Sequence, residues 1–281
     1  MSDEARGVAL VVAAVTSLQF GAGFAVTLFD ELGPAGAAFL RQVIAAVVLV
    51  AIWRPRVRGR PAEDLRLAAA FGITLGLMNL CIYEAMDRIP LGIAVTIEFV
   101  GPLGVAVAGS RRALDLVWVG LAAGGILLLA DPFGEALDTA GIAFALAAGA
   151  LWAAYILLSA RTGRVFPGGS GLAIAMVFGA AATLPFGLPE GGGELLRPEL
   201  LAAGAAVALA SSVIPYSLEL EALRRLPARV FGVLMSLEPA VAALAGLVVL
   251  SQALDVREWL AIGLVVIASA GATTGVPQLR D

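Results

Sequence analysis

Two carboxylates stand inside long apolar stretches of this chain, where a charge is costly and therefore marks a functional site. Glu98 lies between Pro90 and Pro102, and Glu238 directly precedes Pro239. A carboxylate among apolar side chains can exchange a proton or hold an ammonium group, which is chemistry that a membrane transporter needs. The alternative is that each glutamate only makes a hydrogen bond between neighbouring helices.

The sequences around the two glutamates resemble each other. Residues 84–90 read EAMDRIP, and residues 221–227 read EALRRLP. The same interval separates the last proline of each segment from the proline beyond the glutamate, Pro102 or Pro239. This spacing indicates that the chain contains a duplicated unit.

Prolines inside the apolar stretches predict where helices break. A proline removes the hydrogen bond to the carbonyl group four residues earlier. A carbonyl freed beside a carboxylate can accept a cation or an ammonium group, although a simple packing kink is the alternative. The carbonyls freed in this way belong to Glu98 (by Pro102), Met235 (by Pro239) and Ser211 (by Pro215).

Arg41 is a third charge within an apolar stretch. If a helix enters the membrane at Pro34, Arg41 lies about 10 Å deep, close to the expected depth of Glu98. We expect Arg41 to pair with Glu98 or to bind a substrate carboxylate; the alternative is an arginine that reaches back to the membrane surface. Further polar or aromatic candidates near mid-membrane are Gln19, Asn79, Trp152, Tyr155, Ser211, Ser212 and Tyr216.

The composition is that of a membrane protein. Hydrophobic residues make up 60% of the chain, charged residues 14%, and the mean hydropathy is +0.96, whereas soluble domains are more polar. A net charge of −4 without a basic patch argues against nucleic-acid partners. With no histidine and one cysteine, we expect no metal site, internal disulfide or cofactor.

About 20 apolar residues are needed to cross a bilayer, and no soluble domain remains between such stretches here. Gly72 with Gly76, and Gly120 with Gly124, have spacings that permit close helix packing. The stretches predict ten transmembrane helices at residues 7–29, 34–53, 66–84, 90–109, 114–131, 140–160, 170–188, 199–220, 228–250 and 257–275.

All 18 basic residues are arginines, and their distribution predicts the orientation. With the N-terminus in the cytoplasm, most fall in cytoplasmic segments, including Arg111, Arg112 and Arg280. Only Arg88, Arg197 and Arg257 fall on the opposite side, where loops carry acids such as Asp131 and Glu135. Both termini are therefore predicted to be cytoplasmic.

Ten helices divide into two five-helix units, residues 1–133 and 134–281, within a single membrane domain. The similar segments belong to the third and fourth helices and to the eighth and ninth helices. An offset of five helices reverses the direction of the chain, so the sequence predicts two inverted repeats in an all-α membrane protein.

Three segments carry a resemblance to a known family. Residues 89–103 (IPLGIAVTIEFVGPL), 211–219 (SSVIPYSLE) and 231–240 (FGVLMSLEPA) resemble the EamA-type drug/metabolite transporter superfamily, and within it the threonine/homoserine exporter family. The resemblance covers essentially the whole chain. It implies an inner-membrane carrier that exports small neutral amino acids by proton antiport.

On this interpretation the partners are a small-molecule substrate and the lipid bilayer, with the proton gradient as driving force. We expect Glu238 to be the leading proton site and Glu98 to serve the substrate or the structure, because Arg41 lies near its depth. An exporter of hydrophobic drugs or other metabolites, or a membrane scaffold, is the alternative. Without histidine or mid-membrane aspartates, the sequence does not indicate an enzyme.

Overall fold

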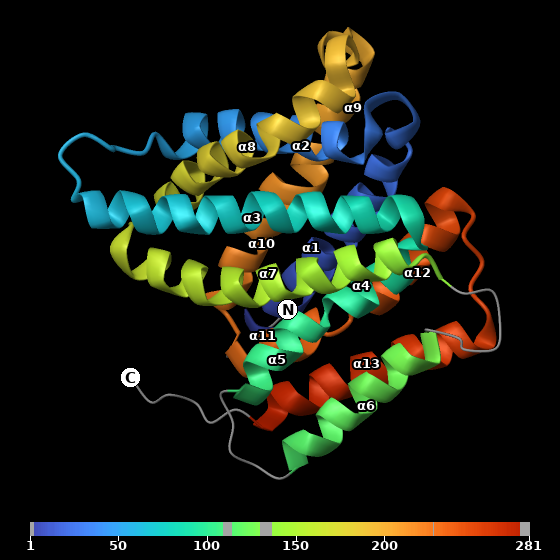
Figure 1. The fold of residues 1–281 in the computed structure, drawn as a ribbon. Coiled ribbons are helices and arrows are strands. Elements are labelled where there is room, and N and C mark those ends of the chain that lie inside the picture. Colours follow the sequence, from blue (N-terminus) through green and yellow to red (C-terminus); the bar gives the residue numbers. More distant parts are fainter. Residues whose placement is uncertain (1–2, 109–113, 130–136, 227, 276–281) are drawn as a thin grey trace.

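The computed structural model describes residues 3–108, 114–129, 137–226 and 228–275. Every regular element in these ranges is helical (Figure 1). The elements are α1 (Asp3–Val26), α2 (Phe29–Trp53), α3 (Ala62–Arg88), α4 (Leu91–Glu98), α5 (Val100–Ala108), α6 (Leu114–Leu129), α7 (Thr139–Val165), α8 (Ser170–Gly191), η1 (Gly192–Leu196), α9 (Pro198–Ala208), η2 (Leu209–Val213), α10 (Ile214–Leu223), α11 (Ala228–Met235), α12 (Glu238–Leu250) and α13 (Val256–Gly275).

Some predictions fall outside the described residues. They concern the orientation, the repeated segment that ends at residue 227 and the boundary between residues 133 and 134. The named residues are Arg111, Arg112, Asp131, Glu135, Pro227 and Arg280.

Three predicted spans consist of consecutive helices that a short irregular segment or, in η2, a π-helical turn separates. They are α4 with α5, α9 with η2 and α10, and α11 with α12. Glu98 is the last residue of α4, and Glu238 is the first residue of α12, so two breaks lie beside the two glutamates. When each of these three spans is counted once, the described residues form ten helices. Among the described residues, seven helices are long and apolar enough to cross a membrane, and two shorter apolar helices lie at Leu91–Val105 and Leu116–Leu128.

Several helices extend beyond their predicted ends. Helix α7 begins at Thr139, where the Asp138 side chain accepts hydrogen bonds from the N–H groups of Ala140 and Gly141, and it continues to Val165. Apolar periodicity stops where side chains become polar, whereas a capped helix continues into the membrane surface. Helix α2 contains a kink at Gly33, with φ 67° and ψ 162°.

The helices pack as a bundle in which α2 lies on α8, and α3 lies on α7 and α8 (Figure 1). Helices α6 and α13 form a pair along one side of it. Gly72 and Gly76 let α3 approach the backbone of α8, as their spacing predicted, because a methyl group at Gly76 would lie 2.6 Å from the carbonyl oxygen of Gly179. Gly120 and Gly124 face open space instead.

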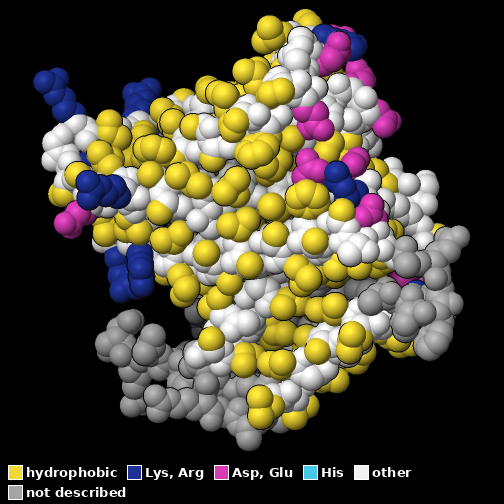
Figure 2. Space-filling view, viewed as in Figure 1, with side chains coloured by type: hydrophobic (Ala, Val, Ile, Leu, Met, Phe, Trp, Pro, Cys, Tyr) yellow, Lys and Arg dark blue, Asp and Glu magenta, His cyan; other side chains and the backbone are white. Residues whose placement is uncertain are grey.

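Charged side chains lie at the two ends of an apolar surface (Figure 2). Arginines project at the left end, where α2 leads into α3, and most acidic side chains lie at the upper right, near α9 and the end of α3. Hydrophobic side chains cover the face between them. This arrangement is the one that a helical bundle crossing a bilayer requires.

Candidate functional site

The two helices that carry the glutamates, α4 and α12, pack against each other in antiparallel directions. The N–H of Leu91, at the start of α4, donates to the Oε1 of Gln252, just beyond the end of α12, at 3.0 Å. At the next residue of α4, a methyl group at Gly92 would lie 2.6 Å from the Cα of Ala243. The beginning of α4 therefore lies beside the end of α12.

This register places the two carboxylates at the same level. At a rise of about 1.5 Å per residue, Glu98 lies about 9 Å along α4 from Gly92. Glu238 lies about 7.5 Å back along α12 from Ala243, in the same direction. The charges of Glu98 and Glu238 interact with each other. The antiparallel contact thus brings together two residues that are far apart in the sequence.

Glu238 is 1% exposed, and its two carboxylate oxygens have different surroundings. The Oε2 atom accepts a hydrogen bond from the Nε2 of Gln19 in α1 at 3.2 Å. The Oε1 atom has no hydrogen-bond partner within the described part of the chain. A buried carboxylate oxygen without a partner is costly, so Oε1 is suited to take a proton or an N–H donor.

Glu98 is also buried, and its carboxylate makes no hydrogen bond or ion pair with any residue that the structure describes. Its backbone carbonyl, which Pro102 was predicted to free, lies against α7. A methyl group at Gly149 would lie 2.6 Å from this carbonyl oxygen. The carbonyl of Glu98 therefore forms part of a tight helix contact, which favours the packing alternative for Pro102.

Arg41 is 5% exposed, so the alternative that it reaches back to the membrane surface is wrong. Its guanidinium donates from Nε to the Ser212 hydroxyl at 3.1 Å, from Nη1 to the Tyr83 hydroxyl at 3.2 Å and from Nη2 to the Ser211 carbonyl at 2.8 Å. The Ser211 carbonyl is the one that Pro215 was predicted to free. Arg41 therefore uses the acceptor that the π-helical turn η2 provides.

Arg41 and Glu98 interact through their charges but form no ion pair. The expectation that they pair directly is therefore wrong. The reason is the position of η2: its π-helical turn presents the Ser211 carbonyl and the Ser212 hydroxyl to the guanidinium. A hydrogen-bonded guanidinium is stabilised in the interior without a carboxylate contact.

The remaining predicted residues differ in their relation to this cluster. Tyr155 and Tyr216 pack against the same buried cluster, and both lie near Glu238. Trp152 packs edge-on against Phe99, with ring centroids 5.2 Å apart. Asn79 donates to the carbonyl of Leu75 in its own helix at 2.8 Å.

Comparisons with known proteins agree with this architecture. Residues 139–274 match the EamA-like transporter family. Over 273 residues, the chain is 41% identical to the threonine/homoserine exporter RhtA of Escherichia coli strain K12, covering 96% of this chain and 92% of that protein. Over 279 residues, it is 40% identical to RhtA of Salmonella typhimurium strain LT2, covering 97% and 94%. The chain belongs to the threonine/homoserine exporter family of EamA-like transporters.

The fold of this family member also matches a solved crystal structure. The TM-score is 0.64, and the match covers 97% of this chain and 99% of the other, with 18% sequence identity. At that identity the likeness concerns the fold alone. It supports the arrangement of the helices that hold the buried glutamates.

Sequence reasoning missed three polar residues of this exporter-family chain. Tyr83 contacts Arg41, and it lies one helical turn from Asn79 on the same face of α3. Gln42 is 2% exposed, and its Nε2 atom has no partner among the described residues. Glu219 follows Tyr216 on α10. Each is a polar residue within a predicted span, which is the signal that would have found it.

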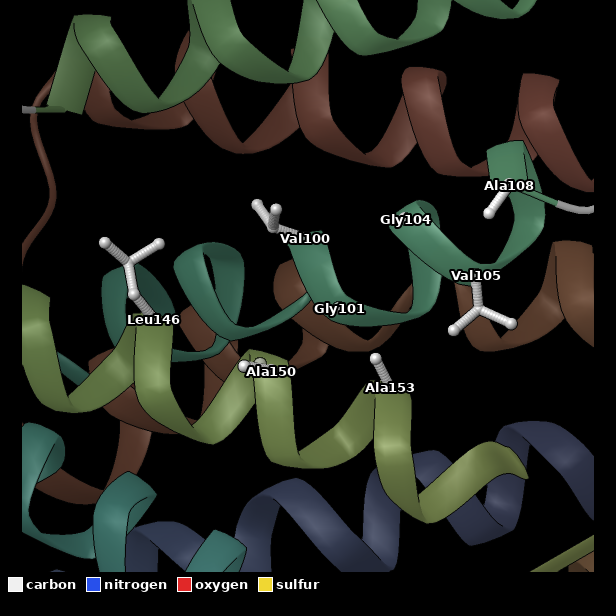
Figure 3. Close-up of a pocket in the computed structure, with 9 residues that line it drawn as sticks. Val100, Gly101, Gly104, Val105, Ala108, Leu146, Ala150 and Ala153 are labelled. Atoms are coloured by element: carbon white, nitrogen blue, oxygen red, sulfur yellow. The ribbon is translucent and has the colours of Figure 1, made fainter. Parts of the chain in front are cut away.

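An apolar groove lies between α5 and α7 (Figure 3). Its volume is ≈ 420 Å³, and none of its lining residues is charged or has a polar side chain. In Figure 3, Ala150 and Ala153 of α7 point toward α5, and Val105 points back toward α7. A zwitterion finds no charged partner there, so the polar cluster around Arg41, Glu98 and Glu238 is the better candidate for the site of this exporter-family chain.

Proposed function

We propose that this protein is an inner-membrane secondary transporter that exports small neutral amino acids, such as threonine and homoserine, in exchange for protons. The observation that carries the proposal is Glu238, a buried carboxylate with one unpartnered oxygen, at the level of Glu98. The names of its relatives, threonine/homoserine exporters, support the substrate class.

The polar cluster offers complementary groups to an amino-acid zwitterion. The ammonium group can bind Glu238 at Oε1, with Glu98 on the facing helix. The substrate carboxylate can bind Arg41, because a guanidinium has five N–H groups and three of its nitrogen atoms already donate one bond each here. Ser211, Ser212, Tyr216, Tyr155, Trp152, Gln19 and Asn79 complete the proposed set.

Exchange follows if the proton and the ammonium group compete for Glu238. A carboxylate that holds a proton has lost the charge that attracts the ammonium group. A proton arriving from outside would then displace the substrate, and a substrate arriving from the cytoplasm would displace the proton. Such mutually exclusive binding couples an inward proton to an outward amino acid.

The movement that alternates access would involve the two five-helix units. Gln19 with Glu238, and Arg41 with Ser212, join the first unit to the second at the centre. Glu98 ending α4 and Glu238 beginning α12, on antiparallel helices, support the predicted inverted repeats. The separated charges of Figure 2 support cytoplasmic termini.

The Glu238→Gln variant tests the proton site. In proteoliposomes, a gradient that is acid on the external face should drive threonine transport by the unmodified protein. The variant should show only the flux of empty vesicles, because glutamine cannot take up and release the proton. Glu63→Gln, an exposed carboxylate at the start of α3, is the control. Full gradient-driven transport by Glu238→Gln would contradict the assignment.

The apolar groove favours one other candidate function, export of hydrophobic compounds. Its size of ≈ 420 Å³ would admit a small apolar molecule. Counterflow separates the two candidates: labelled threonine should exchange against unlabelled threonine, and a lipophilic cationic dye should not compete. Competition by the dye without exchange of threonine would favour the second function.

A further inference from the structure

Glu219 is a carboxylate of the predicted eighth span for which the mechanism above has no use. We propose that Glu219 receives protons from Glu238 and passes them to the cytoplasm during each exchange cycle. The proposal rests on the proposed proton antiport and assigns its cytoplasmic proton path.

The position of Glu219 on its helix directs it toward the centre of the bundle. Ser212, Tyr216 and Glu219 are spaced as successive turns of one helix face. The Ser212 hydroxyl accepts a hydrogen bond from Arg41 of α2, and Tyr216 packs against a buried cluster that includes residues of α2, α3 and α8. Ala222, three residues beyond Glu219 on the neighbouring part of this face, packs in one cluster with residues of α1. Glu219 therefore lies between two positions of α10 that both pack against other helices. Glu219 lies about 10 Å from Ser212 toward the predicted cytoplasmic end.

Glu219 also has no partner to neutralise it. Its carboxylate makes no hydrogen bond and no ion pair among the residues that the structure describes. Two residues further on the same helix, Glu221 accepts a hydrogen bond from the Nε of Arg225 at 3.1 Å, which holds the pKa of Glu221 below its usual range. An inward-facing carboxylate without a countercharge is costly in a membrane helix, so its default interpretation is functional.

Two tyrosines lie near both Glu219 and Glu238. Tyr155 of α7 and Tyr216 of α10 pack against the same buried cluster, within electrostatic range of both carboxylates, and neither hydroxyl hydrogen-bonds to a carboxylate in the described part of this structure. Tyr216 also interacts with Arg41 of α2 and Glu98 of α4, the other charged groups that face it. A phenolic hydroxyl both donates and accepts a hydrogen bond. When a side-chain movement brings it into hydrogen bonds with both groups, it can accept the proton of the Glu238 carboxyl while its own proton passes to the Glu219 carboxylate, so the tyrosine is unchanged.

Burial gives this path a direction. Glu238 is 1% exposed, whereas Glu219 is only partly buried. Beyond Glu219, helix α10 leads to Arg224, which is exposed at the predicted cytoplasmic surface. A proton on Glu219 therefore has a shorter route to water than a proton on Glu238.

The test compares Glu219→Gln with Glu221→Gln, its matched control on the same helix. Everted vesicles with an acid interior measure gradient-driven uptake of labelled threonine, and proteoliposomes without a gradient measure threonine–threonine counterflow. Counterflow needs no net proton transfer. Glu219→Gln should slow gradient-driven uptake at least about tenfold, as loss of a proton-transfer group does, and keep counterflow. Glu219→Asp should recover part of the uptake, and Glu221→Gln should behave as the unmodified protein.

Each contrary result has its own meaning. Normal gradient-driven uptake by Glu219→Gln would overturn the role of Glu219 and leave the proposed antiport intact. Loss of counterflow together with uptake would overturn it as well, because a structural defect explains both. If threonine uptake by the unmodified protein does not depend on the proton gradient, the proposed antiport is wrong, and this inference is wrong with it.

Discussion

Arg41 keeps a full positive charge inside the bundle because acceptors from two other elements surround its guanidinium. The hydroxyl groups of Ser212 and Tyr83 and the carbonyl of Ser211 lie in three different directions. A planar guanidinium can serve such a set, whereas a lysine ammonium is a point charge on a flexible stem. The side chain is therefore fixed in place before any substrate arrives.

This geometry predicts that the Arg41→Lys variant keeps the positive charge but binds the substrate more weakly. Losing a charge-assisted hydrogen bond costs about 1.5–3 kcal/mol, so the KM for threonine should rise roughly tenfold or more. Initial rates of export over a range of threonine concentrations measure it. Arg164→Lys is the control, because the Nε of that exposed arginine donates only to the carbonyl of Ala160 in its own helix. An unchanged KM in Arg41→Lys would remove Arg41 from the proposed site.

At the scale of elements, the contact between the α4–α5 break and α7 depends on Gly149. A methyl group there would lie 2.6 Å from the carbonyl oxygen of Glu98. The break beside Glu98 can therefore approach α7 only where α7 has no side chain. The position of the Glu98 carboxylate follows from this approach.

Gly149→Ala should consequently destabilise the protein and disturb transport. Overpacking of this kind costs about 1–3 kcal/mol, so the midpoint of thermal unfolding in detergent should fall. Gly163→Ala in the same helix is the matched control, because a methyl group at Gly163 meets open space. Alanine is the better helix former by about 1 kcal/mol, so that variant should be equally or more stable. Equal midpoints for both variants would contradict the proposed contact.

The sequence could predict those features of these elements that depend only on residues close together in the chain. Pro215 removes a hydrogen bond whatever surrounds it, so the free carbonyl of Ser211 was predictable. Its partner Arg41 was not, because that contact depends on how α2 crosses η2. For the same reason the sequence found Glu98 and Glu238 but could not show that α4 and α12 place them at one level. Tyr83 was missed because a tyrosine in an apolar stretch is no strong signal by itself.

At the scale of the whole molecule, the charge distribution sets how the bundle lies in the membrane. Most arginines in this view lie at one end and most acidic side chains at the other, with an apolar face between the two ends (Figure 2). If the arginine-rich end is cytoplasmic, α10 carries Glu219 from the centre toward the cytoplasm. The proposed proton path therefore depends on the orientation as much as on the residues.

Cysteine labelling tests that orientation. The chain has one cysteine, Cys81, so a Cys81→Ser background is free of thiols. Arg58→Cys lies between α2 and α3 at an exposed position, and Gly193→Cys lies in η1, where a new side chain meets open space. A membrane-impermeant maleimide should label Gly193→Cys in intact spheroplasts and Arg58→Cys only in everted vesicles, because arginine-rich loops stay in the cytoplasm. The reverse labelling pattern would show that the protein has the opposite orientation in the membrane, and Glu219 would then lie toward the outside.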